Sequence, residues 1–189
     1  MHHQSGISAA AALQNLRAGN EAYLAATVCG GDISPAIREK TCLEGQQPYA
    51  IVVTCSDSRV IPEAIFSAGI GQLFVIRVAG NVMDDHQLGS IEYAASHLGC
   101  KLVLVLGHTH CGAVDAAIHH EPEGYIKFIT DEICRAIGPE KDPYKACCLN
   151  VQRSIAVIEE SLDIRRDEEH GLKVAGAIYH IEDGRVEFL

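Results

Sequence analysis

The chain has 189 residues, the usual length of one α/β domain, and 48% of them are hydrophobic. No stretch of about 20 residues is free of charged side chains, which excludes a membrane-spanning helix. The formal net charge of -10 argues against nucleic acid or an anionic membrane as a partner.

Two helices are predicted at the start of the chain. Apolar residues such as Leu13 and Leu16 recur at helical spacing over residues 8–26, and a Ser-Pro pair opens a short helix over residues 34–43. We interpret residues 1–44 as an N-terminal helical arm. Its first helix either lies over a partner subunit or packs on its own subunit.

Three buried strands of a parallel sheet are predicted in the middle of the chain. The runs are rich in Val, Ile and Leu without clean alternation, as expected when both faces of a sheet are covered. The intervening stretches are helical, and this alternation indicates right-handed βαβ units. The predicted strands are residues 49–54, 73–78 and 102–106, the helices are 62–68 and 90–98, and the whole core is 45–120.

Helices and an edge hairpin are predicted for the last part of the chain, residues 121–189. A helix over residues 113–119 follows the third strand, and two more are expected at 124–136 and 145–162. Strands at 173–181 and 185–189 are separated by Asp183-Gly184, a two-residue hairpin signal. The predicted fold is one α/β domain over residues 1–189, with a mostly parallel central sheet of about four strands, an antiparallel C-terminal strand or hairpin, and flanking helices.

The eight cysteines bear on the cellular compartment. The start of the chain shows no basic segment followed by an apolar one, so no signal peptide is visible and we expect a cytoplasmic protein with reduced thiols. Metal binding or catalysis is then the expected use of cysteine. A redox protein is the alternative, but the sequence has no Cys-x-x-Cys motif.

Candidate ligands follow two of the predicted strands. Cys55, Asp57 and Arg59 lie just beyond the first strand, and His108 and Cys111 lie just beyond the third. In open α/β sheets the ligand crevice forms outside the carboxyl ends of the strands. We therefore expect these side chains to meet there.

Two thiolates and one imidazole are ligands that zinc prefers in tetrahedral geometry. Three protein ligands leave a fourth position for water, which is the pattern of a catalytic zinc site. Gly107 and Gly112 are expected to permit close backbone approach. The alternative for a lone Cys55 is a small hydrophobic side chain at the end of a strand.

Asp57 and Arg59 are expected to act together. A bidentate pair with Arg59 would keep Asp57 ionised and away from the metal, where its carboxylate can orient the attacking group. Alternatively, Asp57 swings inward as a fourth ligand, or the two residues form an ordinary ion pair of a turn. His110 is either an exposed loop histidine or a group that assists proton transfer.

The sequence resembles a known family, the β-class carbonic anhydrases. The motifs that carry the resemblance are CSDSR (55–59), FVIRVAGN (74–81), SIEYA (90–94) and GHTHCGAV (107–114), which occur in the order and at the spacing of the family. The resemblance implies one Zn²⁺ per subunit and a homodimer or higher homo-oligomer. It implies that Cys55, His108 and Cys111 bind zinc, that Asp57 and Arg59 are catalytic, and that Gln46, Phe74, Tyr93 and Gly112 contact substrate.

The reaction that this resemblance implies is the reversible hydration of carbon dioxide to bicarbonate and a proton. Zinc lowers the pKa of bound water from about 15.7 to about 7, so a zinc-bound hydroxide is expected to attack carbon dioxide held against Phe74 and Tyr93. Two alternatives remain. The same site could hydrolyse carbon disulfide or carbonyl sulfide, or the chain is a non-catalytic zinc-binding protein with Asp57 as permanent fourth ligand.

Overall fold

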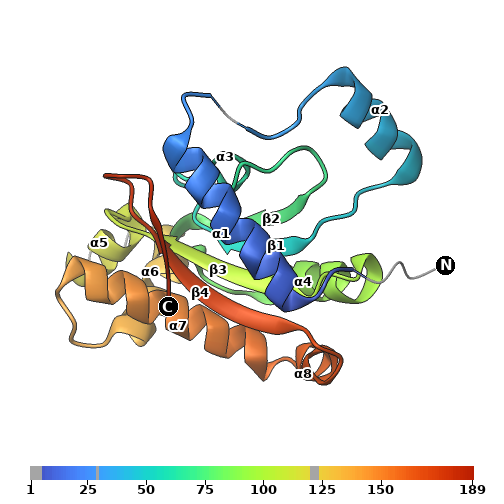
Figure 1. Ribbon diagram of the computed structural model, residues 1–189. Helices are drawn as coiled ribbons and strands as arrows, with labels where there is room; N and C mark the ends of the chain where they lie inside the picture. The colour runs from blue at the N-terminus through green and yellow to red at the C-terminus, as the bar shows by residue number, and fades with distance from the viewer. Residues whose placement is uncertain (1–5, 29, 120–123) are drawn as a thin grey trace.

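A five-stranded sheet forms the centre of the computed structural model, which describes residues 6–28, 30–119 and 124–189 (Figure 1). The strand order is β2-β1-β3-β4-β5; the first four strands are parallel and β5 is antiparallel to β4. This confirms the predicted α/β fold. The strands are β1 (Ala50–Thr54), β2 (Leu73–Arg77), β3 (Leu102–His108), β4 (Lys173–Tyr179) and β5 (Val186–Phe188).

Helices cover both faces of the sheet. On one face, α1 and α3 enclose an apolar core; on the other, α4 to α8 enclose a larger one. Within the described ranges, every helix is too short or too polar to span a lipid bilayer. The helices are α1 (Ala9–Ala25), α2 (Pro35–Glu44), α3 (Pro62–Ile65), α4 (Asp85–Leu98), α5 (Gly112–His119), α6 (Ile126–Ile137), α7 (Pro143–Glu160) and α8 (Leu162–Glu169), with a short 3₁₀ turn, η1 (Ala79–Asn81).

The central strands are apolar throughout because alternate side chains enter different cores. Val53 and Val105 face the α4 to α8 side, whereas Val52 and Leu104 face α1 and α3. Every residue of β1 and β3 is buried. A strand buried on both faces needs apolar residues at every position, which explains the uninterrupted runs in the sequence.

Two helical predictions differ from the structure. α4 begins at Asp85, about a turn earlier than predicted, because Asp84 and Gln87 form a capping box around its first turn. The stretch predicted as one helix over residues 145–162 is two helices, α7 and α8. The break lies at Ser161, which ends α7 and whose hydroxyl accepts the Ile164 N–H as the N-cap of α8.

The predicted C-terminal hairpin is confirmed, but its turn is longer than the two residues Asp183-Gly184. β4 ends at Tyr179 and β5 begins at Val186, so the connection is longer. Gly184 has a φ of 81° and its N–H donates to the carbonyl of His180 at 2.8 Å. A wider loop results, and it extends past the sheet toward the end of β3.

The N-terminal helix α1 packs on its own subunit. Leu16 is fully buried against the sheet, and the buried Asn20 side chain makes three hydrogen bonds. Its amide donates to the Ile65 and Gly184 carbonyls at 3.2 and 3.0 Å, and its carbonyl oxygen accepts the Val186 N–H at 2.9 Å. The buried face of this helix therefore packs on its own subunit, which is one of the two predicted alternatives.

Replacing Asn20 with alanine is expected to lower the free energy of unfolding by about 3 kcal/mol, because three buried backbone groups would lose their partner. Urea denaturation measures the change. Asn15→Ala is the matched control, because Asn15 is exposed on the same helix. Equal effects of the two substitutions would contradict the prediction.

Candidate metal centre

Three potential metal ligands meet at one edge of the sheet. Cys55 directly follows β1, His108 is the last residue of β3, and Cys111 directly precedes α5. β1 and β3 are parallel neighbours, so their carboxyl ends lie side by side. The two sulfurs and the imidazole nitrogen all lie within 4.8 Å of one another, and all three residues are buried. The structure thus brings together the three residues that the sequence singles out.

The orientation of the His108 ring leaves one nitrogen for a metal. Nδ1 lies 2.8 Å from the Thr109 carbonyl oxygen, so Nδ1 carries the hydrogen and donates it. Nε2 is buried and has no hydrogen-bond partner among the described residues. Buried polar atoms are almost always paired, so an unprotonated nitrogen in this state fits a metal ligand.

The two cysteines share the character of a ligand pair. The neighbouring Cys111 thiol is the main cause that lowers the pKa of Cys55 to about 4 against the opposing effect of burial, with smaller contributions from His108 and from the Gly80 N–H. The same interaction with Cys55 raises the pKa of Cys111. The pair therefore holds one proton between two sulfurs, and a soft divalent cation would displace it. Two thiolates with one imidazole are the donor set that zinc prefers, so these residues fit that ion.

Asp57 is held by Arg59 in a bidentate pair. The guanidinium donates from Nε to Oδ1 at 3.0 Å and from Nη2 to Oδ2 at 2.7 Å, as the sequence predicts. These bonds hold the pKa of the Asp57 carboxyl well below its usual range. Oδ2 lies 4.0 Å from His108 Nε2. The ligand cluster formed by the described residues does not include Asp57. The structure therefore shows Asp57 paired with Arg59 and not as a fourth metal ligand.

Arg77 supports the same turn and was missed in the sequence. Its Nε donates to the Cys55 carbonyl at 3.2 Å and its Nη2 donates to the Asp57 carbonyl at 2.7 Å. The signal lies in the strand register, since Arg77 ends β2 opposite Thr54, the residue before Cys55. An arginine opposite Thr54 can therefore donate hydrogen bonds to the backbone carbonyls of the turn that follows β1.

The C-terminal loop supports the second ligand segment. Glu182 accepts from the Thr109 hydroxyl and contacts His110 Nε2, both at 2.8 Å. His110 is exposed and adopts a φ of 55°, and its carbonyl accepts from Arg59 at 3.0 Å. These bonds fix the turn between His108 and Cys111. Because Glu182 is distant in sequence, no local pattern indicates this contact.

The residues expected to contact substrate lie in separate segments of the described chain. Gln46 is exposed in the loop before β1, and Gly112 is the first residue of α5. The Phe74 and Tyr93 rings lie 6.2 Å apart, and Tyr93 is 47% exposed. The apolar wall that these two rings form therefore lies at the surface of the single chain.

The two glycines beside the ligands differ. A Cβ at Gly107 would lie 2.6 Å from Val151 Cγ2, so glycine is required there for close packing on α7. A Cβ at Gly112 would meet nothing within 4 Å. Close backbone approach is therefore seen at Gly107, where the neighbour is α7, whereas at Gly112 the expectation stays a prediction.

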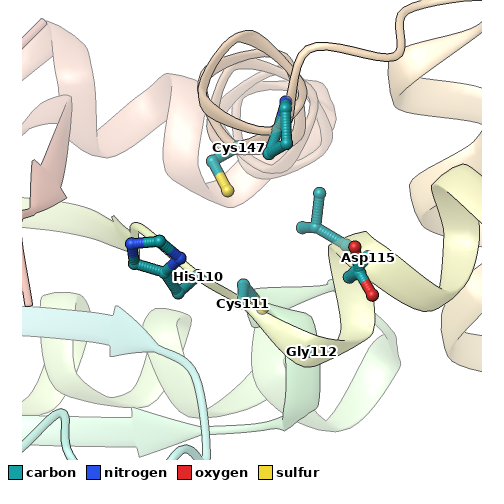
Figure 2. Close-up of a pocket in the computed structure, with 7 residues that line it drawn as sticks. His110, Cys111, Gly112, Asp115 and Cys147 are labelled. Atoms are coloured by element: carbon teal, nitrogen blue, oxygen red, sulfur yellow. The ribbon is translucent and has the colours of Figure 1, made fainter.

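A pocket of about 240 Å³ lies beside Cys111 (Figure 2). The Cys147 sulfur points from α7 toward the turn that carries His110 and Cys111. Of the four residues predicted to contact substrate, Gly112 lines this pocket, whereas Gln46, Phe74 and Tyr93 do not. Its lining residues are His110, Cys111, Gly112, Val114, Asp115, Pro143 and Cys147.

Known proteins resemble this chain over most of its length. Residues 50–186 match the family model described as carbonic anhydrase. A carbonic anhydrase of Mycolicibacterium smegmatis is 34% identical, with 94% of this chain and 91% of the relative covered. Carbonic anhydrase 2 of Mycobacterium tuberculosis is also 34% identical, with coverages of 93% and 90%.

Solved structures show the same fold. A structure described as one of two tetrameric β-carbonic anhydrases from Sordaria macrospora superposes with a TM-score of 0.74 at 28% identity, covering 95% of this chain and 94% of that one. The β-carbonic anhydrase CafA of Aspergillus fumigatus gives a TM-score of 0.74 at 26% identity, with coverages of 82% and 81%. With its Cys-His-Cys cluster at the sheet edge, this chain belongs to the β-class carbonic anhydrase family.

Proposed function

We propose that this protein is a zinc-dependent carbonate dehydratase, which interconverts carbon dioxide and bicarbonate. The observation that carries the proposal is the buried cluster of Cys55, His108 and Cys111, whose ligand atoms lie within 4.8 Å of one another. Membership of the carbonic anhydrase family supports the same activity. A zinc ion held by these residues supplies Lewis-acid activation of water near neutral pH.

The remaining residues of the site bind and orient. Asp57 stays ionised beside Arg59 and accepts a hydrogen bond from the attacking water, which keeps the water oxygen directed at the substrate carbon. Arg59 fixes that carboxylate in place and is itself fixed by the His110 carbonyl. Both residues act as positioning groups whose effect depends on the bidentate geometry.

The substrate lies against Phe74 and Tyr93, with Gln46 and the Gly112 amide as polar contacts. An apolar wall suits carbon dioxide, which has no net charge and only weak hydrogen-bonding groups. In the single chain this wall is exposed at Tyr93, and a second subunit would enclose it. The catalytic unit that we propose is therefore a homo-oligomer.

The helix α2 supports the proposed assembly. None of its ten described residues is buried, and it stands away from the sheet (Figure 1). Large apolar side chains in and before it are exposed, including Val28 at 77%, Ile33 at 67% and Leu43 at 79%. A helix without a buried residue that carries exposed apolar side chains is a candidate surface for contact with a second subunit. The tetrameric relative from Sordaria macrospora is consistent with this reading.

Replacing Leu43 with glutamate is expected to shift the protein toward monomer, because a charge would be buried in the interface without a partner. Sedimentation equilibrium measures the mass. Glu39→Ala on the same helix is the control and should leave the mass unchanged. If Leu43→Glu retains the parental assembly, the interface lies elsewhere.

The activity is tested by measuring metal content and carbon dioxide hydration on the same preparation. We expect about one zinc per chain and rapid hydration in a stopped-flow assay. Release of sulfide from carbonyl sulfide or carbon disulfide without hydration of carbon dioxide would indicate the hydrolase instead. Stoichiometric zinc with neither activity would indicate a non-catalytic zinc protein. Purified, folded protein that cannot be loaded with metal would overturn the proposal.

A further inference from the structure

A short buried turn lies directly against the metal centre and has an uncommon backbone. Gly80 and Asn81 in η1 both have positive φ values, 67° and 46°. Both residues are buried. Residues other than glycine rarely adopt a positive φ. The conformation costs Gly80 little, whereas at Asn81 it is less favourable and persists because the surrounding structure holds it.

The conformation directs the Gly80 N–H at a metal ligand. This amide donates to Cys55 Sγ at 3.3 Å. The position has little space for a larger residue, because a Cβ at Gly80 would lie 2.7 Å from Ile133 Cδ1 and 3.1 Å from Ala113 Cβ. Side chains of α5 and α6 therefore pack closely against the turn that carries this amide.

Two buried side chains of α7 hold the carbonyl groups of the same turn. Asn150 Nδ2 donates to the Gly80 carbonyl at 2.7 Å. The Ser154 hydroxyl is shared between the Asn81 carbonyl oxygen at 2.9 Å and the Asn150 carbonyl oxygen of its own helix at 3.1 Å. Asn150 is 2% exposed and Ser154 is 3% exposed. The two residues are four apart in sequence, so they project from one face of α7.

We propose that Asn150 and Ser154 are positioning residues of the metal centre, which hold the Gly80–Asn81 turn so that its amide donates to the Cys55 sulfur. The proposal rests on the metal site described above. A hydrogen bond to a thiolate is charge-assisted, and it draws electron density from the sulfur. α7 thereby sets how strongly Cys55 donates to a bound cation. Such outer contacts typically change metal affinity by about 10- to 100-fold when removed.

The test uses the full chain with zinc replaced by Co²⁺. The near-ultraviolet absorption of a cobalt–thiolate bond arises from electron transfer from sulfur to metal. Losing a hydrogen bond raises the electron density on sulfur, so this band should shift to longer wavelength in Asn150→Leu and Ser154→Ala. We also expect about a 10-fold loss of zinc affinity in chelator competition, because Cys55 is then no longer held in place for the metal, and this loss outweighs the stronger donation of the sulfur.

The matched control is Thr130→Val in α6. Thr130 is likewise buried, but its hydroxyl bonds to Ile126 and Lys127 carbonyls of its own helix and not to the turn. This variant should keep the parental cobalt spectrum and zinc affinity even where its stability falls. Ser154→Ala removes only one oxygen atom, so it serves if Asn150→Leu fails to fold.

Three results would overturn the inference. Parental cobalt spectra and zinc affinities in the folded α7 variants would show that the turn does not depend on α7. An equal shift in Thr130→Val would show that general loosening of the fold is responsible. A parent chain that takes up neither Co²⁺ nor Zn²⁺ would overturn the metal centre itself. That failure can be told apart from failure of the α7 inference, because it is seen in the unsubstituted protein.

Discussion

Replacing His108 with alanine is expected to remove the bound metal and with it the hydration of carbon dioxide. The imidazole supplies one of three ligands, and its Nε2 is the buried nitrogen that has no partner within the described residues. Two sulfurs alone leave a divalent ion with fewer protein ligands than zinc sites use. Metal analysis should show substoichiometric zinc, and the stopped-flow rate should fall to that of the uncatalysed reaction.

His119→Ala is the control for that substitution. His119 lies at the end of α5, is exposed, and its Nδ1 lies 2.9 Å from the Asp115 carbonyl oxygen of its own helix. Metal content and rate should match those of the parent. A zinc-free His108→Ala protein that still hydrates carbon dioxide at the parental rate would refute the ligand assignment.

Replacing Asp57 with asparagine is expected to lower turnover by about 100-fold or more while zinc stays bound. The amide has nearly the shape of the carboxylate, so the fold and the three ligands remain. However, it loses the negative charge and one of the two acceptors that Arg59 grips at 2.7 and 3.0 Å. The group that orients the attacking water is then misplaced. Metal analysis and the kcat for hydration together measure the outcome.

Asp183→Asn is the matched control for the loss of a carboxylate. Asp183 lies two residues before an arginine, as Asp57 does, and its side chain contacts Arg185 in the C-terminal loop. Hydration should be unaffected by this change. Loss of zinc in Asp57→Asn would contradict a purely orienting role and would indicate that the carboxylate helps to retain the metal.

Much of the site follows from the sequence because its parts lie at strand ends. The uninterrupted apolar runs identify β1 and β3, and parallel pairing then places Cys55 next to His108 without further information. The Asp57–Arg59 pair is similarly local, since the two residues are only two apart. The ligand positions and the Asp57–Arg59 pair thus depend only on short segments and on the rule that ligand sites form at the carboxyl ends of parallel strands.

The parts that the sequence did not indicate depend on contacts between distant segments. Arg77, Glu182 and Asn150 reach the site from β2, the C-terminal loop and α7. Each is a common surface or helix residue with no distinguishing local pattern. The width of the C-terminal loop was also mispredicted, because Asp183-Gly184 favours a tight turn locally while the bonds of Asn20 to Gly184 and Val186 support a wider one.

The hydrogen bonds of Asn20 also bear on the order of folding. They join segments 164 and 166 residues apart, and Thr109 meets Glu182 across 73 residues. A nascent chain that ends before residue 182 contains all three metal ligands but lacks the loop that fixes the second of them. The turn that carries His108 therefore gains this support only after residue 182 has been synthesised, and long-range pairing of this kind also slows folding. Deletion of residues 182–189 should therefore impair metal uptake although it removes no ligand.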